Sequence, residues 1–216
     1  MIQPAPTHPE PPAVIRRRRV VVAVVVVIGG TLLGFSMTRR PGDASFAWLT
    51  LALAAAWTIG ALVSGPLHLG SSRRPVLTGT VAGLLVGAAF VVGGLIVREF
   101  TWVRELVVRV LEFANYGPLW LVVLITVING VAEELFFRGA LYTASGAVHP
   151  GVISTVIYIV VTAAATGNPM LGVAAAILGA VCAFERRITG GVLAPMLTHS
   201  LWGLAMVLAL PRVFGL

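Results

Sequence analysis

The chain has 216 residues, of which 58% are hydrophobic and only 11% are charged. Soluble domains carry roughly 25% charged residues, so this composition excludes a soluble globular domain and indicates an integral membrane protein. The net charge is +7. The basic residues are all arginines, gathered in short groups at the ends of apolar runs, which argues against a nucleic-acid partner and for contact with membrane lipids.

The amino terminus is predicted to be a disordered tail over residues 1–15, because Met1 to Val14 contains five prolines. Arg16 to Arg19 precede the first apolar run, which has no cleavage pattern and resembles a signal anchor. Slightly more arginines fall on the side of this terminus than on the other, which predicts a cytoplasmic amino terminus. The arginine-only basic set is typical of a GC-rich bacterial genome, so we expect a multi-pass protein of a bacterial plasma membrane.

The rest of the chain, residues 16–216, is predicted to be one membrane domain of all-α class, a polytopic bundle of transmembrane helices. The apolar runs are continuous rather than alternating, which favours helices over a β-barrel. Each run is close to the roughly 20 residues that a helix needs to cross the hydrocarbon core. The seven predicted spans are 20–38, 46–64, 76–97, 118–142, 151–166, 169–184 and 190–210.

The segment 101–116 has a different pattern. Glu105, Arg109 and Glu112 recur at helical spacing opposite a run of apolar residues, which predicts an amphipathic helix lying at the membrane interface. If this helix crosses the membrane instead, the number of spans rises to eight.

The fourth predicted span carries three ionisable residues, Glu133, Glu134 and Arg138. Each costs at least about 2.5 kcal/mol in a bilayer, so such residues are a functional site by default. Glu134 and Arg138 are four residues apart and are predicted to pair on one helix face. Glu133 points about 100° away from Glu134, on a polar stripe with Asn129 and Thr126, so the two carboxylates are expected to have separate roles.

His199 lies in the middle of the last predicted span. Both His199 and Glu133 are nine residues from the ends of their spans that should share a membrane face, a depth of about 13 Å at 1.5 Å per residue. Thr162, in the 151–166 span, is expected at about 16 Å from that face by the same rise per residue. Antiparallel packing would therefore allow the three side chains to meet at one level.

The run from Glu133 to Gly139 reads Glu-Glu-Leu-Phe-Phe-Arg-Gly and resembles the EExxxR signature of the CAAX prenyl endopeptidase type 2 family. This family is also called CPBP or Abi and includes CAAX proteases and bacteriocin-processing or immunity proteins. The later run from Thr189 to His199, with Pro195 before the histidine, is similar to the last motif of the family. The resemblance covers about residues 118–212, which we take as the family-like catalytic core.

The resemblance implies an intramembrane endopeptidase that hydrolyses a membrane-associated peptide or protein. Glu133 would be the residue that activates a water, and His199 would stabilise the oxyanion or assist the water. Glu134 and Arg138 would be structural or would orient the substrate. Hydrolysis of a peptide bond needs a base for the water and a donor aimed at the developing oxyanion, so these roles are chemically consistent.

Two motifs depart from the family pattern. The FxxxH motif is replaced by Tyr158-Ile-Val-Val-Thr162, and the asparagine of HxxxN is replaced by Gly203. Threonine can position a water but is no base near neutral pH, so Thr162, Asn129 and Tyr158 are taken as accessory residues. Catalytic zinc usually has three protein ligands, whereas Glu133 and His199 are the only two well-placed candidates for zinc or another divalent metal. The sequence indicates no other cofactor.

These departures leave a second hypothesis open. The chain would then be a catalytically inactive member of the family, acting as a membrane binding, scaffold or immunity protein that keeps the polar residues for stability. A small transporter is a third alternative, although neither repeats nor interrupted helices are evident. The oligomeric state and the identity of the substrate are not indicated by the sequence.

Overall fold

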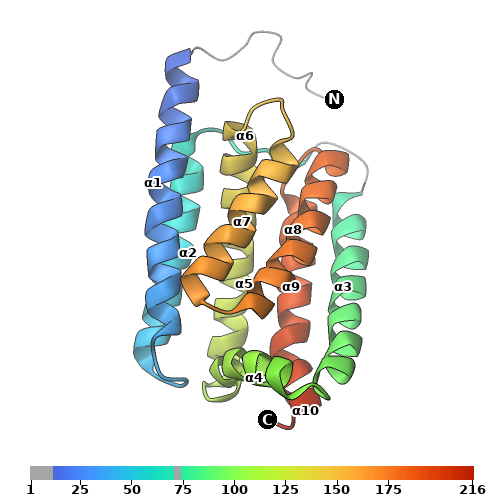
Figure 1. Cartoon of the computed structure of the whole chain (residues 1–216). Coiled ribbons are helices and arrows are strands. Elements are labelled where there is room, and N and C mark those ends of the chain that lie inside the picture. The colour runs from blue at the N-terminus through green and yellow to red at the C-terminus, as the bar shows by residue number, and fades with distance from the viewer. Residues whose placement is uncertain (1–11, 71–73) are drawn as a thin grey trace.

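The computed structural model describes residues 12–70 and 74–216, and every regular element in these ranges is a helix. The helices stand side by side as an upright bundle, with one helix lying across an end (Figure 1). The predicted all-α bundle is therefore confirmed. The elements in chain order are α1 (Pro12–Met37), α2 (Ala44–Ser64), α3 (Pro75–Val97), α4 (Thr101–Asn115), α5 (Leu119–Glu134), η1 (Leu135–Leu141), α6 (Tyr142–Ala144), α7 (Pro150–Thr166), α8 (Pro169–Thr189), α9 (Leu193–Leu208) and α10 (Leu210–Phe214).

Six helices in the described ranges are long and apolar enough to cross a membrane. The helix at the position of the fifth predicted span, α7, is apolar but has only 17 residues, the lower limit for a transmembrane helix. The seven predicted spans thus correspond to six full-length helices and one short one. The six are 12–37, 44–64, 75–97, 119–144, 169–189 and 193–214.

The first helix begins earlier than the sequence predicts. Pro12 to Ile15 belong to α1 rather than to a tail, because proline fits the first turn of a helix, where its missing N–H is not needed. The remainder of the predicted tail, residues 1–11, lies outside the described residues. In the helix the arginines are more than anchors for lipid: Arg18 is buried, and Arg19 donates a hydrogen bond to the carbonyl of Ala144.

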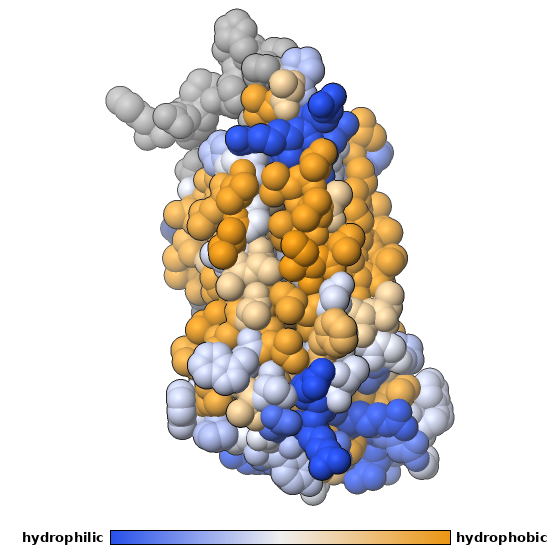
Figure 2. All heavy atoms as spheres, turned by 90° about the vertical axis from the view of Figure 1, so that its left-hand side faces the viewer, coloured by the Kyte–Doolittle hydropathy of each residue, from blue (hydrophilic) through white to orange (hydrophobic). Residues whose placement is uncertain are grey.

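The outer surface has the pattern of a membrane protein. Viewed from the side of α1, a hydrophobic band occupies the middle of the molecule between hydrophilic ends (Figure 2). Val20, Val24, Val27, Ile28 and Phe35 on this helix are between 45% and 68% exposed. Such a continuous apolar surface would aggregate in water and is stable in hydrocarbon, so the chain is a multi-pass membrane protein.

The amphipathic helix α4 lies across one end of the bundle rather than along it (Figure 1). Val103 and Leu111 are buried on its inner side, while Arg104 and Arg109 are exposed. The side-chain amide of Asn168 donates a hydrogen bond of 2.8 Å to the carbonyl of Leu106 and fixes α4 to the turn before α8. The structure thus agrees with an interfacial helix, not an eighth span.

Helices α3 and α9 pack closely because glycines face α9. A Cβ added at Gly79 would lie 2.5 Å from the carbonyl oxygen of Ala194, and one at Gly83 would lie 2.8 Å from the Cβ of Leu201. The hydroxyl of Thr198 also donates to the carbonyl of Gly79. Small residues at a helix contact let the backbones approach in this way. The contact fixes the position of α9, which carries His199.

Candidate active site

The helix that carries the EExxxR motif changes its winding within the motif. It is α-helical up to Glu134 and π-helical from Leu135 to Leu141, and the N–H of Tyr142 bonds the carbonyl of Phe137, five residues earlier. Single π-turns inside α-helices occur frequently at functional sites. All residues from Phe136 to Leu141 in this turn are buried.

Two aromatic residues inside the motif anchor this π-turn. The rings of Phe136 and Phe137 lie 4.6 and 5.1 Å from the ring of Trp57 on α2, and Phe137 lies 4.8 Å from Tyr158 on α7. Trp57 in turn packs against α1, where a Cβ at Gly29 would overlap its ring. The residues between the glutamates and the arginine therefore hold the motif in the aromatic core of the bundle.

Glu134, Arg138 and His199 form a fully buried cluster. The carboxylate oxygen Oε1 of Glu134 accepts a hydrogen bond of 3.2 Å from Nη1 of Arg138 and lies 2.8 Å from Nδ1 of His199. The side chains of Glu134 and Arg138 are 0% exposed, and that of His199 is 9% exposed. The predicted pair of Glu134 and Arg138 is present, and His199 joins it.

Arg138 is held from several sides. Its Nη2 donates a hydrogen bond of 2.9 Å to the carbonyl of Gly179 on α8, which also accepts from the hydroxyl of Thr155. The guanidinium carbon lies 4.9 Å from the centre of the Tyr158 ring, within the range of a cation–π interaction. A buried charge is tolerated only with such partners, so Arg138 connects α7, α8 and the motif.

Glu133 lies on the other side of the His199 ring. Its Oε2 is 4.0 Å from Nε2 of His199, and its side chain is 17% exposed. The hydroxyl of Tyr158 lies beside its carboxylate. A distance of 4.0 Å is too long for a direct hydrogen bond, but a water bonded to both groups fits a gap of this kind. The imidazole of His199 therefore stands between two carboxylates with different surroundings.

The contact with Glu134 selects one tautomer of the His199 ring. Because Oε1 of Glu134 is an acceptor, Nδ1 of His199 carries the hydrogen that is shared between them. In the neutral ring Nε2 is then an acceptor facing Glu133, and only the imidazolium can donate from that side. Glu134 thus orients the histidine as the carboxylate of a catalytic triad orients its histidine.

Thr126 and Asn129, the polar residues that precede Glu133, donate their hydrogen bonds within α5. Asn129 donates to the carbonyl of Ile125, and Thr126 to that of Val122. The Oδ1 atom of Asn129 is buried and, among the described residues, has no hydrogen-bond partner. This oxygen can therefore accept a hydrogen bond from a water or from a substrate.

Thr162 and Gly203, which replace the histidine and the asparagine of the family motifs, lie in different surroundings. The contact of α7 with the cluster is made by Tyr158, whereas Thr162 lies one turn further along and its carbonyl accepts a hydrogen bond from Thr166. Gly203 packs tightly against α5, because a Cβ at this position would lie 2.8 Å from the methyl group of Thr126. The position that carries asparagine in the family is a close helix contact here.

Sequence reasoning missed several residues of α8 that surround the cluster. Cys182 is fully buried, 3.8 Å from the carbonyl of Pro195. Glu185, the only acidic residue after Glu134 in the sequence, is 2% exposed. Arg186 bonds the carbonyl of Arg138. A lone acid inside an apolar run was the one available signal; the roles of a thiol and a helix-end arginine depend on tertiary packing.

The side chains do not form the site that a catalytic zinc requires. Within residues 12–70 and 74–216, no group of three or more His, Cys, Asp and Glu side chains is arranged to hold a metal ion. Catalytic zinc normally needs three protein ligands, and Nδ1 of His199 is already bonded to Glu134.

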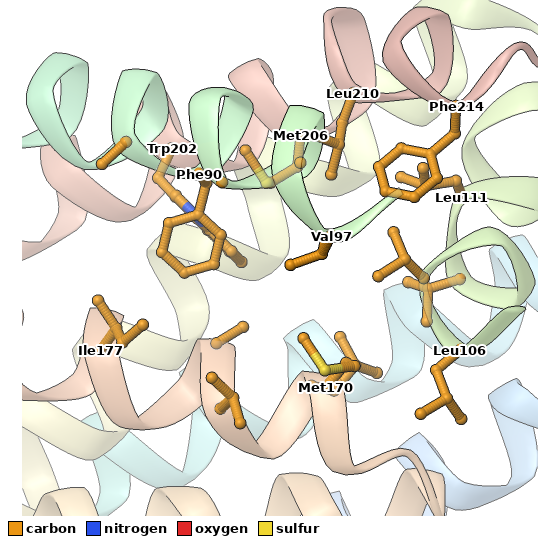
Figure 3. A pocket seen from close by; sticks show the side chains of 18 residues that line it. Phe90, Val97, Leu106, Leu111, Met170, Ile177, Trp202, Met206, Leu210 and Phe214 are labelled. Carbon is orange, nitrogen blue, oxygen red and sulfur yellow. The ribbon is translucent and has the colours of Figure 1, made fainter. Parts of the chain in front are cut away.

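An apolar cavity of about 290 Å³ lies beside the cluster, between α3, α4, α8, α9 and α10. We call it the pouch. Figure 3 shows Trp202 and Phe90 together at one end of it, and Leu111 and Phe214 at the other. The ring of Trp202 also lies 5.6 Å from the ring of His199. One tryptophan ring thus stands between the pouch and the catalytic candidate.

These observations define a polytopic helical membrane protein whose bundle encloses a carboxylate–histidine cluster. Residues 115–205 match the family model described as type II CAAX prenyl endopeptidase Rce1-like. This segment contains the whole cluster, and its match to the family model confirms the resemblance seen in the motifs. No curated protein and no solved structure is significantly similar to the chain.

Proposed function

We propose that the chain is an intramembrane endopeptidase that cuts a membrane-associated peptide or protein. The observation that carries this proposal is the position of His199, with Nδ1 on Glu134 and Nε2 facing Glu133 at 4.0 Å. A histidine oriented by one carboxylate, with its second nitrogen 4.0 Å from another, partly exposed carboxylate, is an arrangement for general acid–base catalysis.

In the proposed mechanism, a water bound between Glu133 and His199 attacks the carbonyl carbon of the substrate. Glu133 takes one proton from the water as the new C–O bond forms. The imidazolium of His199 donates a hydrogen bond from Nε2 to the oxyanion and keeps its proton. When the C–N bond breaks, Glu133 returns the proton to the departing amine, so that no proton is gained or lost. Tyr158 and Asn129 assist as neighbours of Glu133 and of the water.

The lining of the pouch indicates the chemical class of the substrate. Its walls are apolar, with Met170, Ile177, Met206 and Leu210 among the lining residues, and it ends at Trp202 beside His199. Apolar cavities with a few polar groups at one end bind ligands by their hydrocarbon parts. The apolar segment of the substrate would therefore lie in the pouch while its peptide bond reaches the cluster.

The arginine distribution and composition support a bacterial plasma membrane as the location, with the amino terminus in the cytoplasm. Membrane lipids surround the bundle, and no feature of the described residues suggests a nucleic-acid partner. The sequence resemblance to bacteriocin-processing and immunity proteins is compatible with substrates other than prenylated ones.

The direct test compares Glu133→Gln with the wild type by membrane proteomics of the host. Glu133→Gln keeps the shape of the side chain but removes the base, so uncut precursors of the substrate should accumulate at an unchanged level of folded protein. Glu105→Gln, at an exposed position of α4, is the matched control and should leave the peptide pattern unchanged. An identical pattern in wild type and Glu133→Gln would reject the peptidase.

One observation favours the alternative of an inactive member that acts as a binding or scaffold protein. The shortest contacts of the cluster are internal to the protein, since Glu134 holds both Arg138 and His199. Such a cluster also serves to fix helix register. The two functions separate in the same experiment, because a scaffold loses its partners when Glu134→Gln unfolds the cluster but is indifferent to Glu133→Gln.

A further inference from the structure

Arg186, in the last turn of α8, reaches back to the motif helix. Its Nε donates a hydrogen bond of 2.9 Å to the backbone carbonyl of Arg138, and its guanidinium carbon lies 4.9 Å from the centre of the Tyr142 ring. Arg187, the next residue, is exposed. The sequence suggested that both arginines meet lipid head groups, and the structure corrects this for Arg186.

The bond from Arg186 completes a reciprocal pair. Arg138 of η1 donates from Nη2 to the carbonyl of Gly179 on α8, and Arg186 of α8 donates to the carbonyl of Arg138. The two helices are therefore joined by two arginine–carbonyl hydrogen bonds that run in opposite directions. The side chain and the backbone of Arg138 are each held by α8.

The backbone of Arg138 is in the middle of the π-turn, between Leu135 and Leu141. A π-turn holds one residue more than an α-turn, and one residue of an α-helix corresponds to about 100° of rotation. If the turn relaxed to α-helix, the parts of the helix before and after it would rotate relative to each other by this amount. Arg138, which lies inside the turn, would then move away from the carbonyl of Gly179, and the hydrogen bond that it donates to Glu134 would shift with it.

We propose that Arg186 is a positioning residue of the cluster: its hydrogen bond to the Arg138 carbonyl and its stacking on Tyr142 hold the π-turn, and through it the bond between Glu134 and His199. Arg186 touches neither His199 nor the gap beside Glu133, so it acts through the helix. Arg186 would have this role whether or not the cluster is catalytic.

The test reads the state of the His199 ring. Protein with ¹⁵N-labelled histidine is placed in lipid nanodiscs, and the signals of His199 among the four histidines are identified with His199→Gln. Arg186→Gln removes the Nε donor and the positive charge. Arg187→Gln removes the same charge one residue away and is the control. Thermal unfolding of each variant is measured in parallel.

We expect the His199 Nδ1 signal to be displaced beyond its linewidth in Arg186→Gln and to keep its wild-type position in Arg187→Gln. Arg186→Lys, which keeps a donor but loses the planar group, should give a smaller displacement in the same direction. A variant that is less stable but has wild-type His199 signals would reduce Arg186 to a stabilising contact and overturn the proposal. If Arg186→Gln does not fold, Arg186→Lys decides by the same criterion.

Discussion

At the scale of single residues, the cluster depends on one carboxylate oxygen that serves two partners. Oε1 of Glu134 accepts from Arg138 and from His199, while Oε2 is buried without a hydrogen-bond partner among the described residues. Removing one member of a buried ion pair leaves an uncompensated charge, which is more costly than the loss of an exposed pair. The cluster is therefore sensitive to each of its members.

Arg138→Met should lower the free energy of unfolding by about 3–5 kcal/mol, because Glu134 remains buried without its cation. Arg98→Met breaks a pair with Glu99 in which the side chains are 43% and 69% exposed. An exposed pair of this kind contributes about 0–1 kcal/mol. Thermal unfolding in detergent micelles compares the two variants, and equal losses would contradict the buried pairing.

Gly203→Asn introduces the asparagine of the family but should destabilise the protein rather than restore function. Its Cβ would lie 2.8 Å from the methyl group of Thr126, and overpacking of this kind costs about 1–3 kcal/mol. Thr126→Ser removes this methyl group alone. The double variant should recover most of the loss in unfolding experiments, and additive effects would show that the clash is not the cause.

The residues of the cluster were only partly predictable. The spacing of Glu134 and Arg138 is enough to predict their pair, since four residues separate neighbours on a helix face. The sequence could not assign His199 to Glu134 rather than to Glu133, because the rotation of α5 relative to α9 depends on tertiary packing. The winding of the helix also changes after Glu134 and re-aims the side chains that follow it. That change depends on Trp57 and α8, which are distant in the sequence.

At the scale of elements, Asn168 has two functions at the junction of α7, α8 and α4. It caps α8, because its Oδ1 accepts from the N–H of Met170 at 3.0 Å, and its Nδ2 donates to the carbonyl of Leu106. The cap was readable from the Asn-Pro start of α8. The link to α4 was not, because nothing in the pattern of an amphipathic helix specifies which loop it meets.

Asn168→Ala should remove both functions, with a loss of about 1 kcal/mol for the cap alone. Asn168→Ser keeps a capping oxygen but is too short to reach Leu106. Hydrogen exchange measured by mass spectrometry should therefore show faster exchange of α4 in both variants, and a weakened start of α8 only in Asn168→Ala. Wild-type protection of α4 in Asn168→Ser would exclude the link.

The positions of the helices were easier to predict than the type of helix, α or π. The apolar runs fix where the helices lie, and their ends agree with the sequence to within several residues. The π-helix η1 escapes this approach, because the run from Leu135 to Leu141 is apolar apart from Arg138 and Gly139 and has no periodicity that distinguishes π from α. The choice is made by packing against α2 and α8.

At the scale of the whole molecule, the position of α4 determines on which side of the membrane each later loop lies. Figure 1 shows that α1, α2 and α3 alternate in direction, so the loop between α1 and α2 lies at the same end of the bundle as α4. The carboxyl end of α2 lies at the opposite end, as does the loop between α6 and α7, because α4 does not cross the bundle. Composition predicted the bundle, while the interfacial position of α4 followed from the charges on one of its faces.

Single cysteines in a Cys182→Ala background test this topology with a membrane-impermeant maleimide. Arg39→Cys and Arg109→Cys should be labelled from one side, and His68→Cys and Val148→Cys from the other; all four positions are exposed. Labelling of Val148→Cys from the same side as Arg39→Cys would mean that α4 crosses the membrane.

The position of the pouch also determines whether the relevant concentration of a ligand is that in the membrane or that in water. Val173 and Ile177 line it and are 49% and 47% exposed on the outer surface of α8, so its opening faces lipid rather than water. A substrate of the proposed peptidase that entered there would arrive by lateral diffusion, and its effective concentration would be its mole fraction in the bilayer. Adding empty lipid to fused proteoliposomes should then slow turnover by surface dilution, although nothing in the aqueous phase has changed.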